Sequence, residues 1–170
     1  KHRMGCYGNP GNQYIIIGIG TDGRLYSRQG LSAPWEQIND NTSNCQSVCT
    51  MNDGKGLLGI GANNIVRKTS YDANWTASVK NSCCATSVAM GQDGTVIGVG
   101  MDRVLYSKAS INDAWEKASS PGEQVYSIAI APDGTIFAVG GGGGQLWSKQ
   151  SYKNLPKQQW QSQGSCCVKA

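Results

Sequence analysis

The stretch Asp133-Gly-Thr-Ile-Phe-Ala-Val-Gly140 decides the fold, because the chain repeats it at a fixed interval. Related stretches begin at Asp93 and Asp53, so the three Asp-Gly pairs are spaced 40 residues apart. The segment Ile15-Ile-Ile-Gly-Ile-Gly20 is a fourth copy of the apolar part. A period of about 20 to 50 residues is typical of solenoids, propellers and other repeat architectures.

Three further elements recur in step with this stretch. A short segment follows each copy, at Arg24–Arg28, Ile65–Thr69, Val104–Lys108 and Gln145–Lys149. A tryptophan comes next, at Trp35, Trp75, Trp115 and Trp160, and the last interval is lengthened by an insertion around Tyr152–Lys157. An apolar segment precedes the Asp-Gly pairs, at Cys45–Met51, Ala85–Met90 and Val125–Ile130. Each repeat therefore holds four strand-like segments separated by Gly, Asn, Asp and Ser.

Four repeats of four strand-like segments predict an all-β fold. We expect a four-bladed β-propeller of four-stranded antiparallel blades, in a single domain spanning residues 1–170. We expect the blades at about residues 1–44, 45–84, 85–124 and 125–170. The segment before each Asp-Gly pair is predicted to be the innermost strand, and the tryptophan strand the outermost. The four repeated tryptophans either cover the seams between blades or serve as platforms for stacking a ligand.

The two ends of the chain align with the same part of the repeat. Met4–Gly8 aligns by count with the innermost strands, and Ser165–Val168 aligns with Ser82–Ala85. We therefore expect the termini to meet and to close the ring at one seam, which leaves no open edge.

These repeat motifs resemble those of tectonin-type and tachylectin-type propeller lectins, over essentially the whole chain. Those lectins usually have five to seven blades, so four is a departure from the pattern. The resemblance implies sugar binding at several similar sites, without catalysis and without a cofactor. It also implies a role in innate defence or egg protection.

Polar and aromatic residues at two places in the repeat are candidates for binding a ligand. The third strands carry Tyr26, Arg67, Tyr106 and Trp147 at what we take as one variable position. The hairpins before them carry Asp22, Asn63 and Asp102, with Arg24 and Arg103 nearby as hydrogen-bond donors. Asp and Asn accept hydrogen bonds from sugar hydroxyls well, but they are also ordinary turn residues, and both interpretations stay open.

Two other patterns are better explained as turns than as catalytic or ligand-binding sites. Asp53, Asp93 and Asp133 each precede a glycine, which is typical of a tight hairpin turn. The glycine run 140–144 is followed by a strand-like segment rather than a helix, so we expect a hairpin loop and no phosphate-binding loop.

The seven cysteines indicate an oxidising compartment. They are Cys6, Cys45, Cys49, Cys83, Cys84, Cys166 and Cys167. Adjacent cysteines in a strand point to opposite faces, so we expect bridges between blades rather than within a pair, and a closing bridge from Cys6 to Cys166 or Cys167. Their odd number leaves one thiol free or joins two chains, so a disulfide-linked homodimer is an open alternative. Their spacing does not suit a zinc site, and we expect no metal.

Composition narrows the function classes. The net charge is a mild +4, and the longest basic cluster is only Lys1-His2-Arg3, which argues against nucleic acid as a partner. No apolar run reaches the length of about 18 residues that a transmembrane segment needs. The single histidine, His2, stands at the chain terminus, so a Ser-His-Asp triad on a rigid element is disfavoured and we expect no enzyme.

The sequence thus predicts a secreted, non-catalytic carbohydrate-binding protein with several glycan sites. Asn41-Thr-Ser and Asn74-Trp-Thr are sequons compatible with secretion, and the chain starts at Lys1 as a mature chain would. The alternative is an extracellular protein-interaction or matrix module that uses one propeller face.

Overall fold

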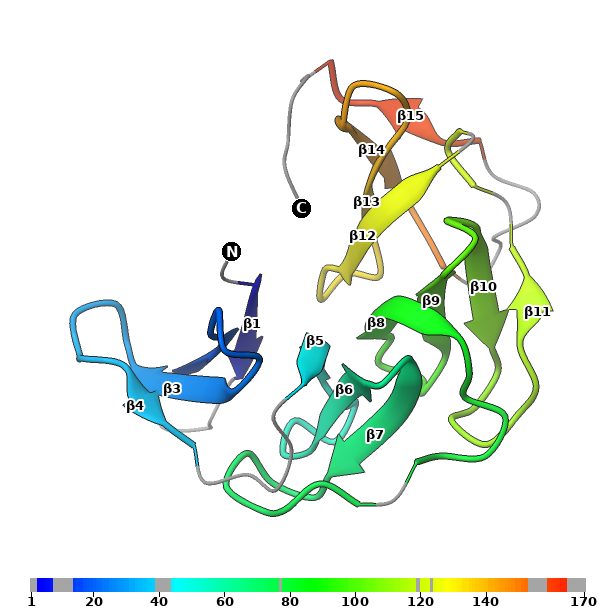
Figure 1. Cartoon of the computed structure of the whole chain (residues 1–170). Helices are drawn as coiled ribbons and strands as arrows, with labels where there is room; N and C mark the ends of the chain where they lie inside the picture. The colour runs from blue at the N-terminus through cyan, green and yellow to red at the C-terminus, as the bar shows by residue number, and fades with distance from the viewer. Residues whose placement is uncertain are drawn as a thin grey trace.

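The computed structural model describes residues 3–7 by their backbone, and residues 14–38, 44–76, 78–118, 120–122, 124–152 and 159–164 in full. Within these residues the chain forms four antiparallel sheets and no helix (Figure 1). This confirms the all-β prediction. Each sheet follows chain order, so neighbouring strands are joined by hairpins.

The strands have the following bounds. The first sheet holds β1 (Arg3–Tyr7), β2 (Ile15–Ile19), β3 (Leu25–Gln29) and β4 (Glu36–Gln37), and the second holds β5 (Cys45–Thr50), β6 (Leu57–Gly61) and β7 (Asn64–Lys68). The third holds β8 (Ala85–Met90), β9 (Val96–Gly100), β10 (Leu105–Lys108) and β11 (Glu116–Lys117). The fourth holds β12 (Val125–Ile130), β13 (Ile136–Gly140), β14 (Gln145–Lys149) and β15 (Gln161–Ser162).

The second sheet has three strands, so the prediction of four strands in every repeat is wrong there. In the described residues after β7, no regular strand forms around Trp75. Two hydrogen bonds still tie this segment to the sheet, because the N–H of Thr76 donates to Arg67 and the N–H of Val79 donates to Ile65. The segment thus runs beside β7 without the continuous ladder of a strand.

The Asp-Gly pairs form the turns that the sequence predicts. The carboxylates of Asp93 and Asp133 each accept a hydrogen bond from the N–H two residues later, at 3.1 and 2.9 Å. The glycines that follow have φ values of 88° and 87°, a left-handed conformation that glycine adopts without strain. The Asp-Gly turns join the first and second strands of the second, third and fourth sheets.

The core is divided among the seams between successive sheets. One cluster packs Ile17 and Leu25 of the first sheet against Leu57 of the second. A second cluster joins the second and third sheets, and a third joins the third and fourth sheets. The first strands lie beside one another in the order β1, β5, β8 and β12 (Figure 1). Each sheet is therefore buried by its neighbours in sequence.

One backbone hydrogen bond recurs at each of these seams. In the hairpin after the second strand, Gly23, Asn63 and Arg103 all have a left-handed φ, of 75°, 64° and 66°. Their carbonyls accept the N–H of the first residue of the next sheet, at 2.9, 3.0 and 2.8 Å respectively. The donors are Cys45, Ala85 and Val125. The left-handed turn residue therefore links one repeat to the next.

The outer faces of the first and fourth sheets differ from the interior seams. Ile97 and Val99 of β9 are fully buried, whereas their counterparts Phe137 and Val139 of β13 are half-buried. Leu31, three residues after Arg28, is 74% exposed. Tyr152, three residues after the equivalent Lys149, is instead buried against the preceding sheet. Both end faces thus carry apolar residues whose counterparts at the interior seams are covered by a neighbouring sheet. The predicted closure through Cys6 and Cys166 or Cys167 depends on side chains outside the described residues.

A basic side chain lies over the tryptophan of every repeat. The last basic residue of each third strand stands 5.0 to 5.8 Å from the indole centre, in the pairs Arg28–Trp35, Lys68–Trp75, Lys108–Trp115 and Lys149–Trp160. The three lysines are at most 2% exposed. A cation over the face of an indole is attracted by the ring's quadrupole, and the attraction is stronger away from water.

Lys108 shows how such a buried cation is accommodated. Its ammonium donates to the carbonyls of Asn81 at 3.1 Å and Ile111 at 2.9 Å. Asn81 belongs to the segment that joins the second and third sheets, so the ammonium fastens that connection to the third sheet. Burial lowers the pKa of Lys108, and the carbonyls and the Trp115 ring offset part of the cost of burying the charge.

We expect Lys108→Met to lower the free energy of unfolding by about 1 to 3 kcal/mol, because the carbonyls of Asn81 and Ile111 lose a charged donor. The check is a urea titration followed by circular dichroism. Lys55→Met, at an exposed position, is the matched control and should leave the midpoint unchanged. Equal midpoints for the two variants would show that the buried ammonium contributes nothing.

Candidate functional site

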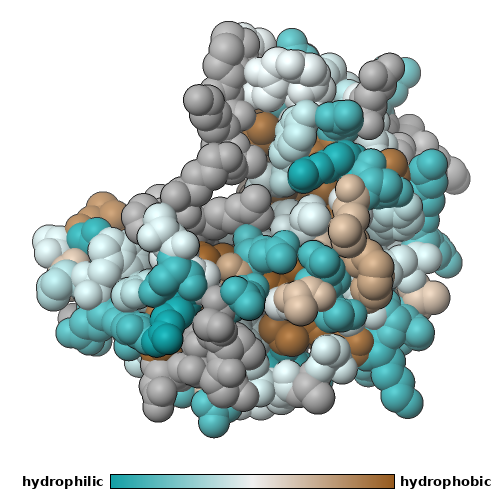
Figure 2. Space-filling view, viewed as in Figure 1, coloured by the Kyte–Doolittle hydropathy of each residue, from teal (hydrophilic) through white to brown (hydrophobic). Residues whose placement is uncertain are grey.

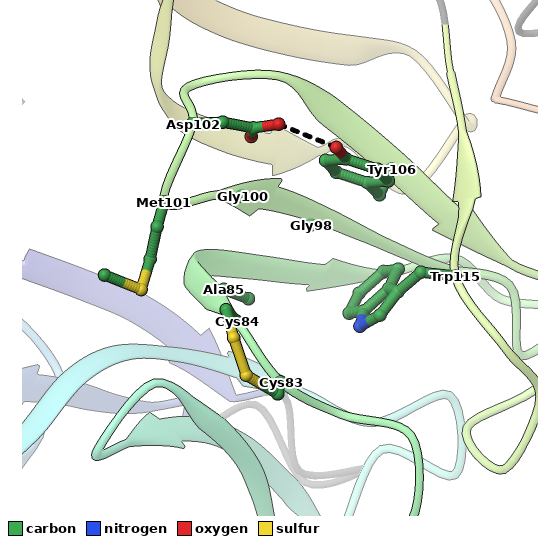
Figure 3. Close-up of a pocket in the computed structure, with 9 residues that line it drawn as sticks. All are labelled: Cys83, Cys84, Ala85, Gly98, Gly100, Met101, Asp102, Tyr106 and Trp115. Atoms are coloured by element: carbon green, nitrogen blue, oxygen red, sulfur yellow. Dashed lines mark hydrogen bonds between the residues drawn. A yellow bond between two sulfur atoms is a disulfide. The ribbon is translucent and has the colours of Figure 1, made fainter.

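The third sheet carries a cavity of about 380 Å³ at one end of its strands. Asp102 and Tyr106 line it on the side of the hairpin between β9 and β10, and Trp115 lines it near the outer strand (Figure 3). Cys83 and Cys84, directly before β8, form another part of the wall. Polar, aromatic and sulfur groups therefore meet around one space.

Asp102 and Tyr106 form a closed polar pair. The Tyr106 hydroxyl donates to the Asp102 carboxylate at 2.7 Å, and the N–H of Val104 donates to its other oxygen at 3.1 Å. The hydrogen bond from Tyr106 lowers the pKa of Asp102, and the same bond raises the pKa of Tyr106. The pair therefore holds a carboxylate and a neutral phenol over a wide range of pH.

Two glycines of β9 make room for the aromatic side chains. A Cβ at Gly100 would overlap the Asp102 carboxylate and the Tyr106 ring, and a Cβ at Gly98 would overlap the Trp115 ring. The two rings meet edge to face, with their centres 6.5 Å apart. The Gly-x-Gly pattern of the repeat is thus a requirement of this site in the third sheet.

The first sheet repeats the same pair. The Tyr26 hydroxyl donates to Asp22 at 2.8 Å, and the N–H of Arg24 donates to the other carboxylate oxygen at 3.0 Å. A Cβ at Gly20 would overlap both side chains, as at Gly100. The hydrogen bonds from Arg24 and Tyr26 lower the pKa of Asp22. Four predicted residues are therefore brought together as two equivalent pairs, one in each of two sheets.

Asn63 does not belong to this set. The hairpin of the second sheet is one residue shorter, with Gly61 paired to Asn64. Asn63 thereby takes the left-handed position of Gly23 and Arg103 rather than that of the aspartates. The expected equivalence of Asn63 with Asp22 and Asp102 is wrong, and the reason is the length of the loop.

Register also corrects the placement of Arg67. Tyr26, Tyr106 and Trp147 lie opposite Gly18, Gly98 and Ala138, but the residue opposite Gly59 is Val66. Arg67 is paired with Leu58, one residue further along, and its side chain is exposed. The second sheet therefore has neither the aspartate nor the aromatic residue of the pair.

The remaining candidates take different positions. Arg103 lies over the ring of Tyr126 in β12, 5.3 Å from its centre, and so belongs to the seam with the fourth sheet. Trp147 shares the register of Tyr106, but its hairpin is the glycine loop, and its indole N–H has no partner among the described residues. Of the repeated tryptophans, Trp75 is buried, Trp115 and Trp160 are half-buried, and Trp35 is 41% exposed.

The cysteines depart from expectation. Cys83 and Cys84 are bonded to one another, so the prediction that adjacent cysteines bridge to other blades is wrong for this pair. Cys45 is a buried thiol that donates to the Ser47 carbonyl, and Cys49 is a free thiol whose pKa burial raises to about 12. The side chains of Cys6, Cys166 and Cys167 lie outside the described residues, so the closing bridge and the homodimer remain predictions.

The cavity wall formed by Cys83 and Cys84 was not predicted from the sequence. One available signal is position, because the pair immediately precedes the first strand and the second strand ends at the same edge of the sheet. The N–H of Met101 donates to the Cys84 carbonyl at 2.9 Å and fixes this proximity.

Other features of the surface bear on the type of partner. On the face shown in Figure 2, hydrophilic side chains predominate, with smaller hydrophobic areas between them. The described residues include no helix long and apolar enough to cross a membrane.

No protein-family model matches the chain, and no curated protein matches it significantly.

We expect the pKa of Asp102 to lie below the ordinary aspartate value of about 3.9 and to rise toward it in Tyr106→Phe, because the phenol stabilises the charged form. A carbon-detected NMR titration measures this directly. The pKa of Asp22 in the same variant serves as the internal control and should not move. An unchanged pKa of Asp102 would show that the pair does not persist in solution.

We expect Gly100→Ala to displace the Asp102–Tyr106 pair, because the new methyl group overlaps both side chains. Gly61→Ala is the matched control, since a Cβ there meets only Val66 at ordinary contact distance. Chemical-shift changes at the Tyr106 ring should be large in the first variant and small in the second. A silent Gly100→Ala spectrum would contradict the packing described above.

Proposed function

We propose that this protein is a secreted, non-catalytic glycan-binding protein of the tectonin and tachylectin type, and that its four sheets are the blades of a propeller. The observation that carries the proposal is the repeated pair, Asp22 with Tyr26 and Asp102 with Tyr106. Packing explains the repetition of the glycines, but it does not explain an exposed carboxylate held beside a phenol in two sheets.

The chemistry of the pair suits a sugar. A carboxylate has about four acceptor positions, and Asp102 uses two of them on Val104 and Tyr106, so it can still accept from sugar hydroxyls. The half-buried Trp115 and the Tyr106 ring supply apolar surface for the CH groups of a pyranose. A cavity of about 380 Å³ lies in the size range of small-molecule sites.

Two equivalent pairs on one chain explain why repetition is useful. A single shallow sugar site binds weakly, and two sites that engage one surface raise the overall affinity through effective concentration. The described hairpins of the second and fourth sheets lack the aspartate, so we assign sites to the first and third sheets only.

The propeller interpretation extends the interior packing to the end faces. Phe137 and Val139 on the fourth sheet and Leu31 on the first are residues whose counterparts are covered at the interior seams. We propose that the fourth sheet meets the first and that the seam is closed by the two ends of the chain. This contact would bury both end faces.

Two observations support secretion. A disulfide between Cys83 and Cys84 forms and persists in an oxidising compartment. Asn74, the acceptor of one sequon, is exposed in the segment after β7.

The proposal predicts binding to a related set of glycans on an array probed with the non-reduced protein. Asp102→Ala and Asp22→Ala should each weaken the binding several-fold, because each removes one carboxylate acceptor. The double variant should abolish binding. Asp72→Ala, which removes an exposed carboxylate from the segment after β7, is the matched control and should bind as the wild type does.

Two results would redirect the proposal. Binding that survives in the double variant would keep the lectin function and move the site to the tryptophans or the opposite face. Folded protein that binds no glycan would overturn the lectin proposal in favour of a protein-interaction module.

A further inference from the structure

The disulfide between Cys83 and Cys84 is placed where a ligand of the third sheet would lie. Both residues are exposed, and both line the cavity that holds Asp102, Tyr106 and Trp115 (Figure 3). Cys45 and Cys49 lie elsewhere, in β5, and neither lines this cavity. The bonded pair is therefore part of the wall of this cavity as well as of the backbone connection between the second and third sheets.

The bond changes the character of that wall. Closing it joins the two side chains through a short ring that includes the peptide between them, so neither side chain rotates freely. Two sulfurs in a disulfide have no S–H donor and present an apolar, polarisable surface. Two thiols would instead be separate, mobile side chains with weak donors, and ordering them against a ligand would cost conformational entropy.

The wall is also coupled to the polar pair. The N–H of Met101 donates to the Cys84 carbonyl at 2.9 Å, and Met101 immediately precedes Asp102 in the hairpin. A rearrangement of the Cys83–Cys84 segment therefore reaches the residue whose carboxylate binds Tyr106. The disulfide segment and the hairpin that carries the polar pair are thus linked by a backbone hydrogen bond.

We propose that the Cys83–Cys84 disulfide is the apolar wall against which a sugar ring packs in the third-sheet site, and that its reduction switches this site off. In the reduction, a dithiol transfers two electrons and two protons. The S–S bond breaks, Cys83 and Cys84 become thiols, and the dithiol closes its own disulfide. This inference rests on the proposed glycan-binding function and adds a redox dependence to one of its two sites.

The first sheet provides a matched comparison. Asp22 and Tyr26 reproduce the polar pair, but among the described residues no disulfide lies beside them. Reduction should therefore distinguish two sites that otherwise have the same polar chemistry.

The experiment measures binding of the full chain to a mucin-coated biosensor surface before and after treatment with dithiothreitol. Asp22→Ala leaves the third-sheet site as the working site, and Asp102→Ala leaves the first-sheet site. We expect reduction to weaken the Asp22→Ala protein by about fivefold or more, reversibly on reoxidation, and to change the Asp102→Ala protein by less than twofold. The double variant Cys83→Ser/Cys84→Ser, in the Asp22→Ala background, should show the same loss without reductant.

Controls separate this effect from general damage. Cys49→Ser removes a free thiol away from the cavity and should bind like its parent. Thermal melting of each reduced protein shows whether it remains folded. Equal losses in the two single-site proteins, or no loss in either, would overturn the redox inference while the lectin proposal stands. Failure of the oxidised wild type to bind mucin or any arrayed glycan would overturn both.

Discussion

The cation over a tryptophan, which is a buried lysine in three of the four sheets, is the interaction on which the repeat depends. It recurs in all four sheets, with the basic group near the end of the third strand. The indole stands just before the fourth strand or, in the second sheet, in the segment that runs beside β7 in place of a fourth strand. Burying a charge is costly unless its partners replace water, and Lys108 finds them in the carbonyls on either side of it and in the ring. The long aliphatic stem fills the interior while the charged end fixes the path of the chain outside the sheet. A purely apolar residue would supply the first function but not the second.

The scaffold is uniform, whereas the hairpins at one rim are not. Gly59 and Gly98 both lie against a tryptophan, and the left-handed residue of each hairpin makes the same bond to the next sheet. Within that frame, the loop between the second and third strands differs in length and composition. Only the loops of the first and third sheets present an aspartate to a tyrosine. In the proposed glycan-binding function, recognition would thus be determined by a few residues that differ between otherwise similar sheets.

The sequence was sufficient to predict four antiparallel sheets in an all-β fold, because a strict period of turns and apolar segments leaves few alternatives. The fourth strand expected in the second sheet is the exception. It also predicted Asp22, Tyr26, Asp102 and Tyr106 as candidates, and the structure pairs them as two equivalent units. It misplaced Asn63 and Arg67, since a hairpin shorter by one residue shifts every later position and turns side chains to the other face. It missed the bond between Cys83 and Cys84, because the argument from opposite faces holds only inside a strand and these residues precede β8. Spacing predicts elements reliably, but it cannot predict how a loop brings two chain segments together.

Three of the seams described above are joined by continuous chain, whereas a seam between the fourth and first sheets would be held only by the chain ends. Without the predicted bridge from Cys6 to Cys166 or Cys167, such a seam is entropically the cheapest to open, since no direct covalent connection then limits the separation of its two sides. On warming, the first and fourth sheets would therefore fray while the second and third keep neighbours on both sides. One Asp–Tyr pair belongs to a terminal sheet and the other to an interior sheet, so the proposed glycan binding would pass from bivalent to monovalent before the protein melts. Its avidity would then respond to temperature in a step of its own, well below the loss of the fold.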